Sequence, residues 1–150
     1  MKSKQIALTS LLAFCATLSV AAPDGKTIMI SGGDSMKYTV TKIEASPGQK
    51  IVVVLKNDGN MPKEAMGHNW ILLKAGEDAQ AYANAAVTAK AENYQPKSLA
   101  SKVIASIGLL GPKESGKASF TAPTAPGTYA YLCSFPAHCQ VGMKGVLVVK

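Results

Sequence analysis

The feature that most constrains this chain is one short segment near its C-terminus, Cys133-Ser134-Phe135-Pro136-Ala137-His138-Cys139-Gln140-Val141-Gly142-Met143. It carries a thiol, an imidazole and a thioether at intervals of five residues, on Cys133, His138 and Met143. The segment lies between two runs typical of strands, Thr128 to Leu132 and Gly145 to Val149. We therefore expect one loop between two strands to present all three groups together.

These groups form the donor set of a blue-copper electron-transfer site, which also needs a second imidazole. The chain contains two histidines, and the other one is His68. Singly, each of these residues is more often structural, because such side chains are commonly buried. Together they predict one copper ion bound by His68, Cys133, His138 and Met143. A trigonal set of two imidazoles and a thiolate with a distant axial group suits both Cu(I) and Cu(II).

Two other interpretations remain open. A zinc site formed by His68, Cys133, His138 and Cys139 has suitable ligand types, but adjacent residues in extended backbone point to opposite sides. An immunoglobulin-like adhesion domain without metal is suggested by Trp70 and the Tyr-x-Cys pattern. It lacks the second cysteine, on an early strand, that such a domain uses for its inter-sheet disulfide.

The first residues have the pattern of an export signal. Lys2 and Lys4 are followed by the apolar run from Ile6 to Leu18 and by the small residues Val20-Ala21-Ala22. We expect residues 1–22 to be a cleaved signal peptide and residues 23–150 to form one domain in the periplasm, without a membrane span. The net charge of +7 comes from scattered lysines without any arginine, which argues against a nucleic-acid partner.

Short apolar or alternating runs separated by turn residues predict an all-β sandwich. The predicted strands are Thr27–Ile30, Met36–Val40, Ile51–Leu55, Asn69–Leu73, Val103–Ile107, Ala118–Thr121, Thr128–Leu132 and Gly145–Val149. One segment departs from this pattern, because alanine-rich residues Glu77 to Glu92 show helical spacing and begin with two acidic side chains. We expect a helix there, inserted in a long connection.

Two stretches resemble the copper-ligand regions of azurins. The first runs from Gly59 through Gly67-His68-Asn69 to Trp70, and the second comprises Cys133 to His138 followed by Met143-Lys144-Gly145. The resemblance is strong in these two stretches and weaker along the rest of residues 23–150. It identifies the chain as an azurin-like cupredoxin, a type 1 blue copper protein.

The resemblance implies a Greek-key β-sandwich of about eight strands with one inserted helix. It implies His68, Cys133, His138 and an axial Met143 as ligands, with the backbone carbonyl of Gly67 on the opposite side. The backbone N–H groups of Asn69 and Phe135 would donate to the Cys133 sulfur and favour the reduced metal. The Asn69 side chain would join the two ligand loops.

The resemblance also implies that electrons pass through the exposed edge of His138, within an apolar patch. Candidates for this patch are Met36, Met61, Met66, Phe135 and Ala137. Three features depart from azurins. Four residues separate His138 from Met143, as in plastocyanin-like cupredoxins; the N-terminal disulfide is absent; and Asn57 replaces a buried titrating histidine.

Together these observations predict a monomeric periplasmic carrier of single electrons, which is not an enzyme. Expected partners are redox proteins such as c-type cytochromes or copper and haem reductases, docking on the apolar patch around His138. A periplasmic protein that binds or delivers copper with the same fold is the alternative. Cys139 is expected to be a spare thiol at the mouth of the site, facing away from the metal and able to cross-link two molecules.

Overall fold

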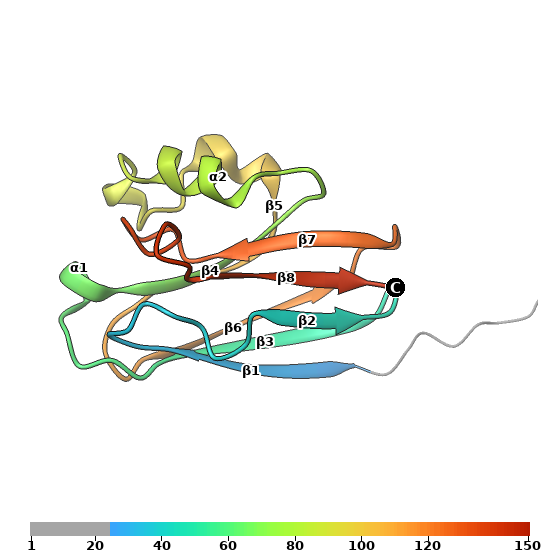
Figure 1. Ribbon diagram of the computed structural model, residues 1–150, viewed down its shortest axis with the longest axis horizontal. Coiled ribbons are helices and arrows are strands. Elements are labelled where there is room, and N and C mark those ends of the chain that lie inside the picture. The colour runs from blue at the N-terminus through green and yellow to red at the C-terminus, as the bar shows by residue number, and fades with distance from the viewer. Residues whose placement is uncertain (1–24) are drawn as a thin grey trace, which may run out of the picture.

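The apolar and alternating runs form eight strands in a computed structural model, which describes residues 25–150 (Figure 1). The strands are β1 (Lys26–Gly32), β2 (Lys42–Ala45), β3 (Lys50–Asn57), β4 (His68–Leu73), β5 (Val103–Leu110), β6 (Ser115–Thr121), β7 (Gly127–Leu132) and β8 (Lys144–Val149). The helices are α1 (Lys63–Met66), α2 (Ala79–Ala86) and the 3-10 helices η1 (Lys90–Glu92) and η2 (Lys97–Lys102).

The strands form two sheets that pack face to face. One sheet has the order β1-β3-β6 and the other β2-β8-β7-β4-β5. β1 pairs with β3 and β2 with β8 in parallel, whereas the other pairs are antiparallel. Alternate side chains of β3 (Ile51, Val53 and Leu55) enter the core, as expected for a strand with one face exposed. The predicted β-sandwich of about eight strands is therefore confirmed.

The order of the central strands brings distant parts of the sequence together. β7 lies between β4 and β8, antiparallel to both. The start of β4 at His68, the end of β7 at Leu132 and the start of β8 at Lys144 consequently meet at one end of the sheet. Residues 133–143 connect β7 to β8 at that end, where α1 also lies, and the C-terminus lies at the other end (Figure 1).

All six residues of β4 are buried, since the other sheet covers one face and the segment containing α2 covers the other. Trp70 on β4 is the largest buried side chain. Its ring lies 6.0 Å from that of Phe120 and 5.5 Å from that of Tyr131, and the Tyr131 ring lies 5.9 Å from that of Tyr38. The contact of Trp70 with Phe120 joins the two sheets, and all three aromatic contacts support the strand that begins with His68.

The inserted helix is present but shorter than predicted. α2 spans Ala79–Ala86, and Asp78 caps its N-terminus by accepting a hydrogen bond from the Ala81 N–H group. Val87 and Thr88 follow directly, and β-branched residues favour helix less than alanine does. The chain continues through η1 and then places Asn93 and Tyr94 in left-handed conformation, so one helix over Glu77–Glu92 was wrong.

The predicted strand Met36–Val40 was also wrong. Met36 has a φ of 54°, which is incompatible with extended backbone. Within this segment only Tyr38 pairs, through an isolated bridge to Gly32. The alternation of side chains instead reflects a loop that buries Tyr38, and the strand forms slightly later as β2.

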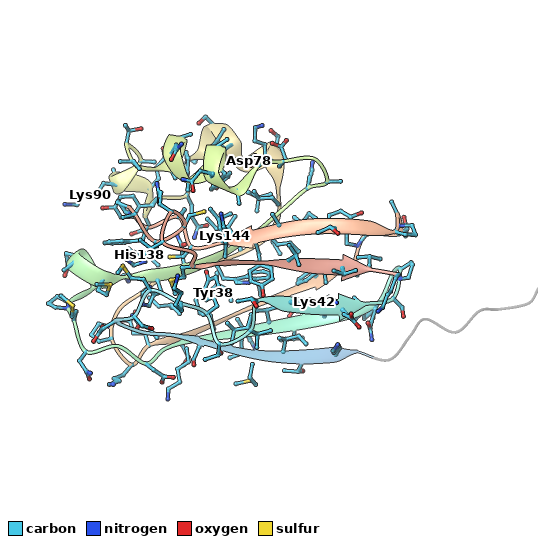
Figure 2. All side chains as sticks on the ribbon, in the orientation of Figure 1. Tyr38, Lys42, Asp78, Lys90, His138 and Lys144 are labelled. Atoms are coloured by element: carbon cyan, nitrogen blue, oxygen red, sulfur yellow. The ribbon has the colours of Figure 1, made fainter. Side chains whose placement is uncertain are left out.

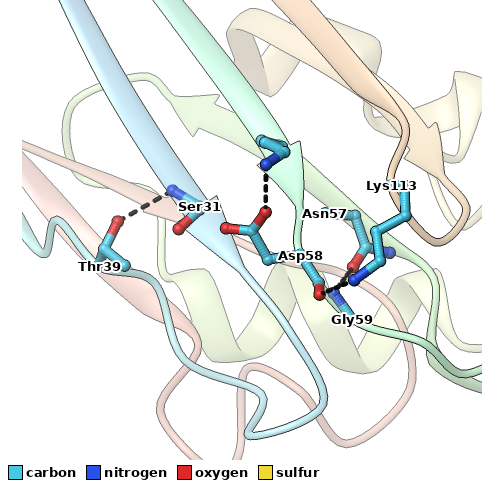
Figure 3. Close-up of polar contacts among 7 residues, drawn as sticks. Ser31, Thr39, Asn57, Asp58, Gly59 and Lys113 are labelled. Atoms are coloured by element: carbon cyan, nitrogen blue, oxygen red, sulfur yellow. Dashed lines mark hydrogen bonds and ion pairs between the residues drawn. The ribbon is translucent and has the colours of Figure 1, made fainter.

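Asn57 closes the end of β3 (Figure 3). Its buried side chain accepts from the Gly59 N–H group at 2.9 Å and donates to the Leu110 carbonyl at 3.2 Å. Lys113 Nζ donates to the Asp58 carbonyl in the same turn. Asn57 therefore forms structural hydrogen bonds at the position where the resemblance places a titrating histidine.

The predicted signal peptide and the domain boundary at residue 23 both lie outside the described residues, which begin at residue 25. Between residues 25 and 150, no helix is both long enough and apolar enough to cross a membrane.

Candidate metal centre

Three predicted ligands converge at the end of the sandwich where β4 begins and β7 ends. The Nδ1 atoms of His68 and His138 are 3.3 Å apart, and His138 Nδ1 lies 3.5 Å from Cys133 Sγ. Imidazole nitrogen and thiolate sulfur bond a metal at about 2.0–2.3 Å. Two such donors around one trigonal ion therefore lie about 3.5–3.7 Å apart. The spacing of the three side chains fits a single ion.

This cluster excludes water on nearly every side. His68 and Cys133 are fully buried and His138 is 2% exposed. In the described part of the chain, no other group of three histidine, cysteine or acidic side chains has this spacing. Cys139 is not among them, so the four-residue zinc site is not formed.

The orientation of the His68 ring prepares it for metal binding. Its Nε2 atom lies 3.1 Å from the Gly33 carbonyl oxygen, which can only accept a hydrogen bond, so Nε2 carries the proton and Nδ1 offers a lone pair. Burial lowers the pKa of His68 below its ordinary value. Burial, followed by the neighbouring His68 ring, lowers the pKa of His138 to about 4. Both imidazoles are therefore neutral near pH 7, as a metal requires.

Burial has the opposite consequence for the thiol. It raises the pKa of Cys133 to about 12, although hydrogen bonds from the backbone N–H groups of Asn69 and Phe135 act in the other direction. A bare thiolate is thus unfavourable here, and a bound cation is what stabilises it. Metal binding near pH 7 should release one proton, from Cys133.

Met143 completes the set. It is fully buried, and its Cε atom lies so close to Gly32 that a Cβ added there would clash with it. Two backbone hydrogen bonds fix its position, one from Cys133 N–H to the Met143 carbonyl at 3.0 Å and one from Met143 N–H to the His138 carbonyl at 2.8 Å. The longer connection between His138 and Met143 is therefore a closed turn, in which Gly142 adopts a φ of +100°.

The Asn69 side chain lies between the two ligand segments. Its side-chain oxygen accepts from Ser134 N–H at 2.8 Å, and its side-chain nitrogen donates to Ser134 Oγ at 2.9 Å. These bonds join the start of β4 to the ligand loop. Phe135 packs on the His138 ring with centroids 4.7 Å apart. Gly67 lies directly before β4, and the role of its carbonyl remains a prediction.

The expectation for Cys139 was wrong in one respect. Its thiol faces away from the three donors, as predicted, but it is fully buried rather than exposed at the mouth of the site. Its Sγ atom lies 3.7 Å from the Ala79 carbonyl oxygen at the start of α2. The cause is α2 itself, which covers this side of the ligand loop, so the thiol cannot reach a second molecule.

Sequence reasoning missed two contributors to the site. The Gly33 carbonyl orients His68, and Ser134 connects Asn69 to the Tyr94 carbonyl. Gly33 gave no signal because its contribution comes from the backbone. Ser134 could have been suspected as a hydroxyl directly beside a ligand, but its partner Tyr94 is 40 residues away.

A two-sheet sandwich with a buried cluster of two imidazoles, a thiolate and a nearby thioether defines the class of type 1 copper proteins. Comparison of the chain with known protein families, sequences and structures agrees with this class. Residues 26–150 match the family described as copper binding proteins, plastocyanin/azurin family. The chain belongs to this family, and the predicted resemblance to azurin-like cupredoxins is confirmed.

Individual relatives are similar over most of the domain. Auracyanin-A of Chloroflexus aurantiacus is 39% identical over 79% of this chain and 70% of its own length. Azurin of Bordetella pertussis is 38% identical over 79% of both chains. The solved structure of auracyanin A, described as a "blue" copper protein, has a TM-score of 0.73 at 37% identity and covers 84% of this chain and 99% of its own. The protein is a copper electron-transfer protein with a site for one type 1 copper ion.

Proposed function

We propose that this chain carries single electrons between redox proteins of the periplasm and is not itself an enzyme. One copper ion would be held by His68 Nδ1, Cys133 Sγ, His138 Nδ1 and the Met143 thioether, with the Gly67 carbonyl as a weaker contact. Copper supplies a Cu(I)/Cu(II) couple that such a donor set accepts in both states. The observation that carries the proposal is the buried convergence of the three strong donors.

The protein's contribution is to keep these donors in place. His68 begins a fully buried strand, and Cys133 and Met143 are joined by a backbone hydrogen bond. Because the donors are fixed in position, little rearrangement accompanies the gain or loss of an electron. The absence of a large rearrangement favours electron exchange over copper release.

The surface near the ligand loop supports the choice of partners. Among the four proposed side-chain ligands only His138 has a measurable exposed fraction. Its neighbour Ala137 is exposed, and Met61 and Val141 are 42% and 44% exposed. Met36 and Met66 are half-buried and Phe135 is 7% exposed. Apolar side chains of this kind would accommodate c-type cytochromes or copper and haem reductases.

A substitution beside His138 tests the docking surface. Ala137→Lys places a charge next to the proposed exit of electrons, and Val87→Lys places the same charge at a similarly exposed apolar position after α2. Electron exchange with a c-type cytochrome is measured by stopped flow at high salt, where steering by distant charges is screened. We expect Ala137→Lys to slow the reaction about tenfold or more. Equal rates in the two variants would contradict docking at His138.

A second experiment separates electron transfer from copper delivery. The copper-loaded protein is reduced and reoxidised repeatedly in the presence of an equimolar Cu(I) chelator. An electron carrier should retain its copper and show a reversible one-electron voltammogram throughout. Transfer of copper to the chelator on first reduction would instead support a delivery protein.

A further inference from the structure

The residue after His68 occupies an irregular position in its strand. In the pairing of β4 with β5, His68 lies opposite Leu110 and Trp70 opposite Ile107, with a register shift between them. Asn69 therefore has no partner in this register. The extra residue of this bulge lies on β5, where Gly108 and Leu109 stand opposite Asn69. Because the ladder is interrupted here, the buried N–H and C=O groups of Asn69 need other contacts.

Asn69 is fully buried, and each of its polar groups has a partner. Its N–H group donates to the Cys133 sulfur, and its side chain exchanges hydrogen bonds with Ser134. The side-chain nitrogen also lies 3.4 Å from the Asn93 carbonyl oxygen. One residue thus connects the first ligand, the second ligand loop and the segment after α2.

The remaining group, the Asn69 carbonyl, accepts a hydrogen bond from the Tyr38 hydroxyl. Tyr38 is 5% exposed and comes from the loop after β1. The isolated bridge to Gly32 and the ring of Tyr131 hold it in place. Figure 2 shows Tyr38 in the interior of the molecule, set back from the end where His138 lies.

We propose that Tyr38 is a positioning residue of the metal centre, which sets the hydrogen bond between Asn69 N–H and the Cys133 sulfur by anchoring the Asn69 carbonyl. The inference rests on Cys133 as the metal ligand. An N–H group that donates to the thiolate withdraws electron density and favours the reduced metal. Without the Tyr38 hydroxyl, the buried Asn69 carbonyl loses its partner, and the peptide shifts to find another donor. The N–H···S bond then weakens and the oxidised state gains.

Tyr131 provides a matched control. Its hydroxyl also donates to a backbone carbonyl, that of Val40, at 2.7 Å, and its ring packs between Trp70 and Tyr38. Val40 makes no hydrogen bond to any of the proposed ligands within residues 25–150. Tyr131→Phe therefore removes an equivalent hydroxyl from the same aromatic cluster without freeing the Asn69 carbonyl.

The test compares Tyr38→Phe with Tyr131→Phe in two measurements. In the copper-loaded proteins, the reduction potential should fall in Tyr38→Phe and remain at the wild-type value in Tyr131→Phe. In the copper-free proteins, amide hydrogen exchange at Asn69 should be roughly tenfold faster in Tyr38→Phe alone, as expected for losing one hydrogen bond. Equal changes in both variants, or no change in either, would overturn the proposal.

One measurement on the wild-type protein does not depend on the variants folding. The Tyr38 hydroxyl proton should exchange slowly and show a through-space NMR contact to the Asn69 backbone, and its absence would also overturn the proposal. Failure of this inference is distinct from failure of the proposed function. If the copper-loaded protein is blue but its reduction potential does not change in Tyr38→Phe, the role of Tyr38 fails while Cys133 remains the ligand. If the wild-type protein shows no blue band with copper, the proposed function itself fails.

Discussion

Gly67 allows the ligand strand to begin close to α1, and replacing it by alanine tests how tightly this end of the site is packed. A Cβ atom on Gly67 would lie 2.6 Å from the Lys63 carbonyl oxygen and 2.9 Å from two atoms of Leu109. Carbon normally approaches oxygen to about 3.3 Å and carbon to about 3.5 Å. The chain at Gly67 must therefore move by about 0.6–0.7 Å, which also displaces His68. Backbone conformation is not the obstacle, because φ and ψ of −66° and 147° suit alanine.

Gly108 on β5 is the control, because a Cβ added there meets nothing within 4 Å. Both substitutions reduce the entropy of the unfolded chain similarly, which stabilises by about 0.4–1 kcal/mol. The difference between them therefore isolates the steric cost, for which we expect about 1–3 kcal/mol against Gly67→Ala. Urea unfolding of the copper-free proteins measures it. If Gly67→Ala is as stable as Gly108→Ala, the close packing of α1 on the ligand strand is refuted.

Three further predictions follow from individual side chains. Met143→Leu should retain copper and raise the reduction potential, because it removes a weak donor that helps Cu(II) more than Cu(I); an unchanged or lower value by voltammetry would show that Met143 does not act on the metal. Wild type and Cys139→Ser should both run as monomers in non-reducing electrophoresis, because the Cys139 thiol is buried, and a dimer in wild type alone would contradict this burial. Burial raises the pKa of Tyr38 and Tyr131 above the ordinary tyrosine value of about 10. Their contribution to the free energy of unfolding should therefore be fully present below pH 10, and above it the free energy of unfolding should fall by up to about 1.4 kcal/mol per pH unit for each tyrosine. A decline in the free energy of unfolding that is no shallower in Tyr131→Phe would count against that residue's share.

The ligand set could be predicted from sequence because its chemistry is specific and its candidates are few. Only two histidines exist, and the spacing of Cys133, His138 and Met143 places three donors in one loop. Strands such as β3 and β8 were also predictable, since their apolar side chains have the two-residue period or continuous run of buried strands. Local patterns were sufficient wherever a single element determined the outcome.

The remaining features depend on contacts between distant segments. Alternation around Tyr38 resembled a strand, but Met36 in left-handed conformation and burial of the Tyr38 ring produce the same pattern in a loop. Cys139 was expected at the mouth of the site because it directly follows His138, yet α2 covers it from more than 50 residues away. The anchoring of Asn69 by Tyr38 spans 31 positions. No local propensity encodes such pairs, because they form only when the sheets pack.

The absorption spectrum of the copper-loaded protein tests the central claim most directly, when it is measured together with two single-cysteine variants. Cys133 and Cys139 are both fully buried free thiols, but only Cys133 belongs to the three-donor cluster. Wild type and Cys139→Ser should show an intense blue band from Cu(II)–thiolate bonding. Cys133→Ser should remain folded and lack the band, because a hydroxyl is a harder and far less acidic donor. An intense blue band in Cys133→Ser, or its loss only in Cys139→Ser, would contradict the assignment of Cys133 as the copper ligand.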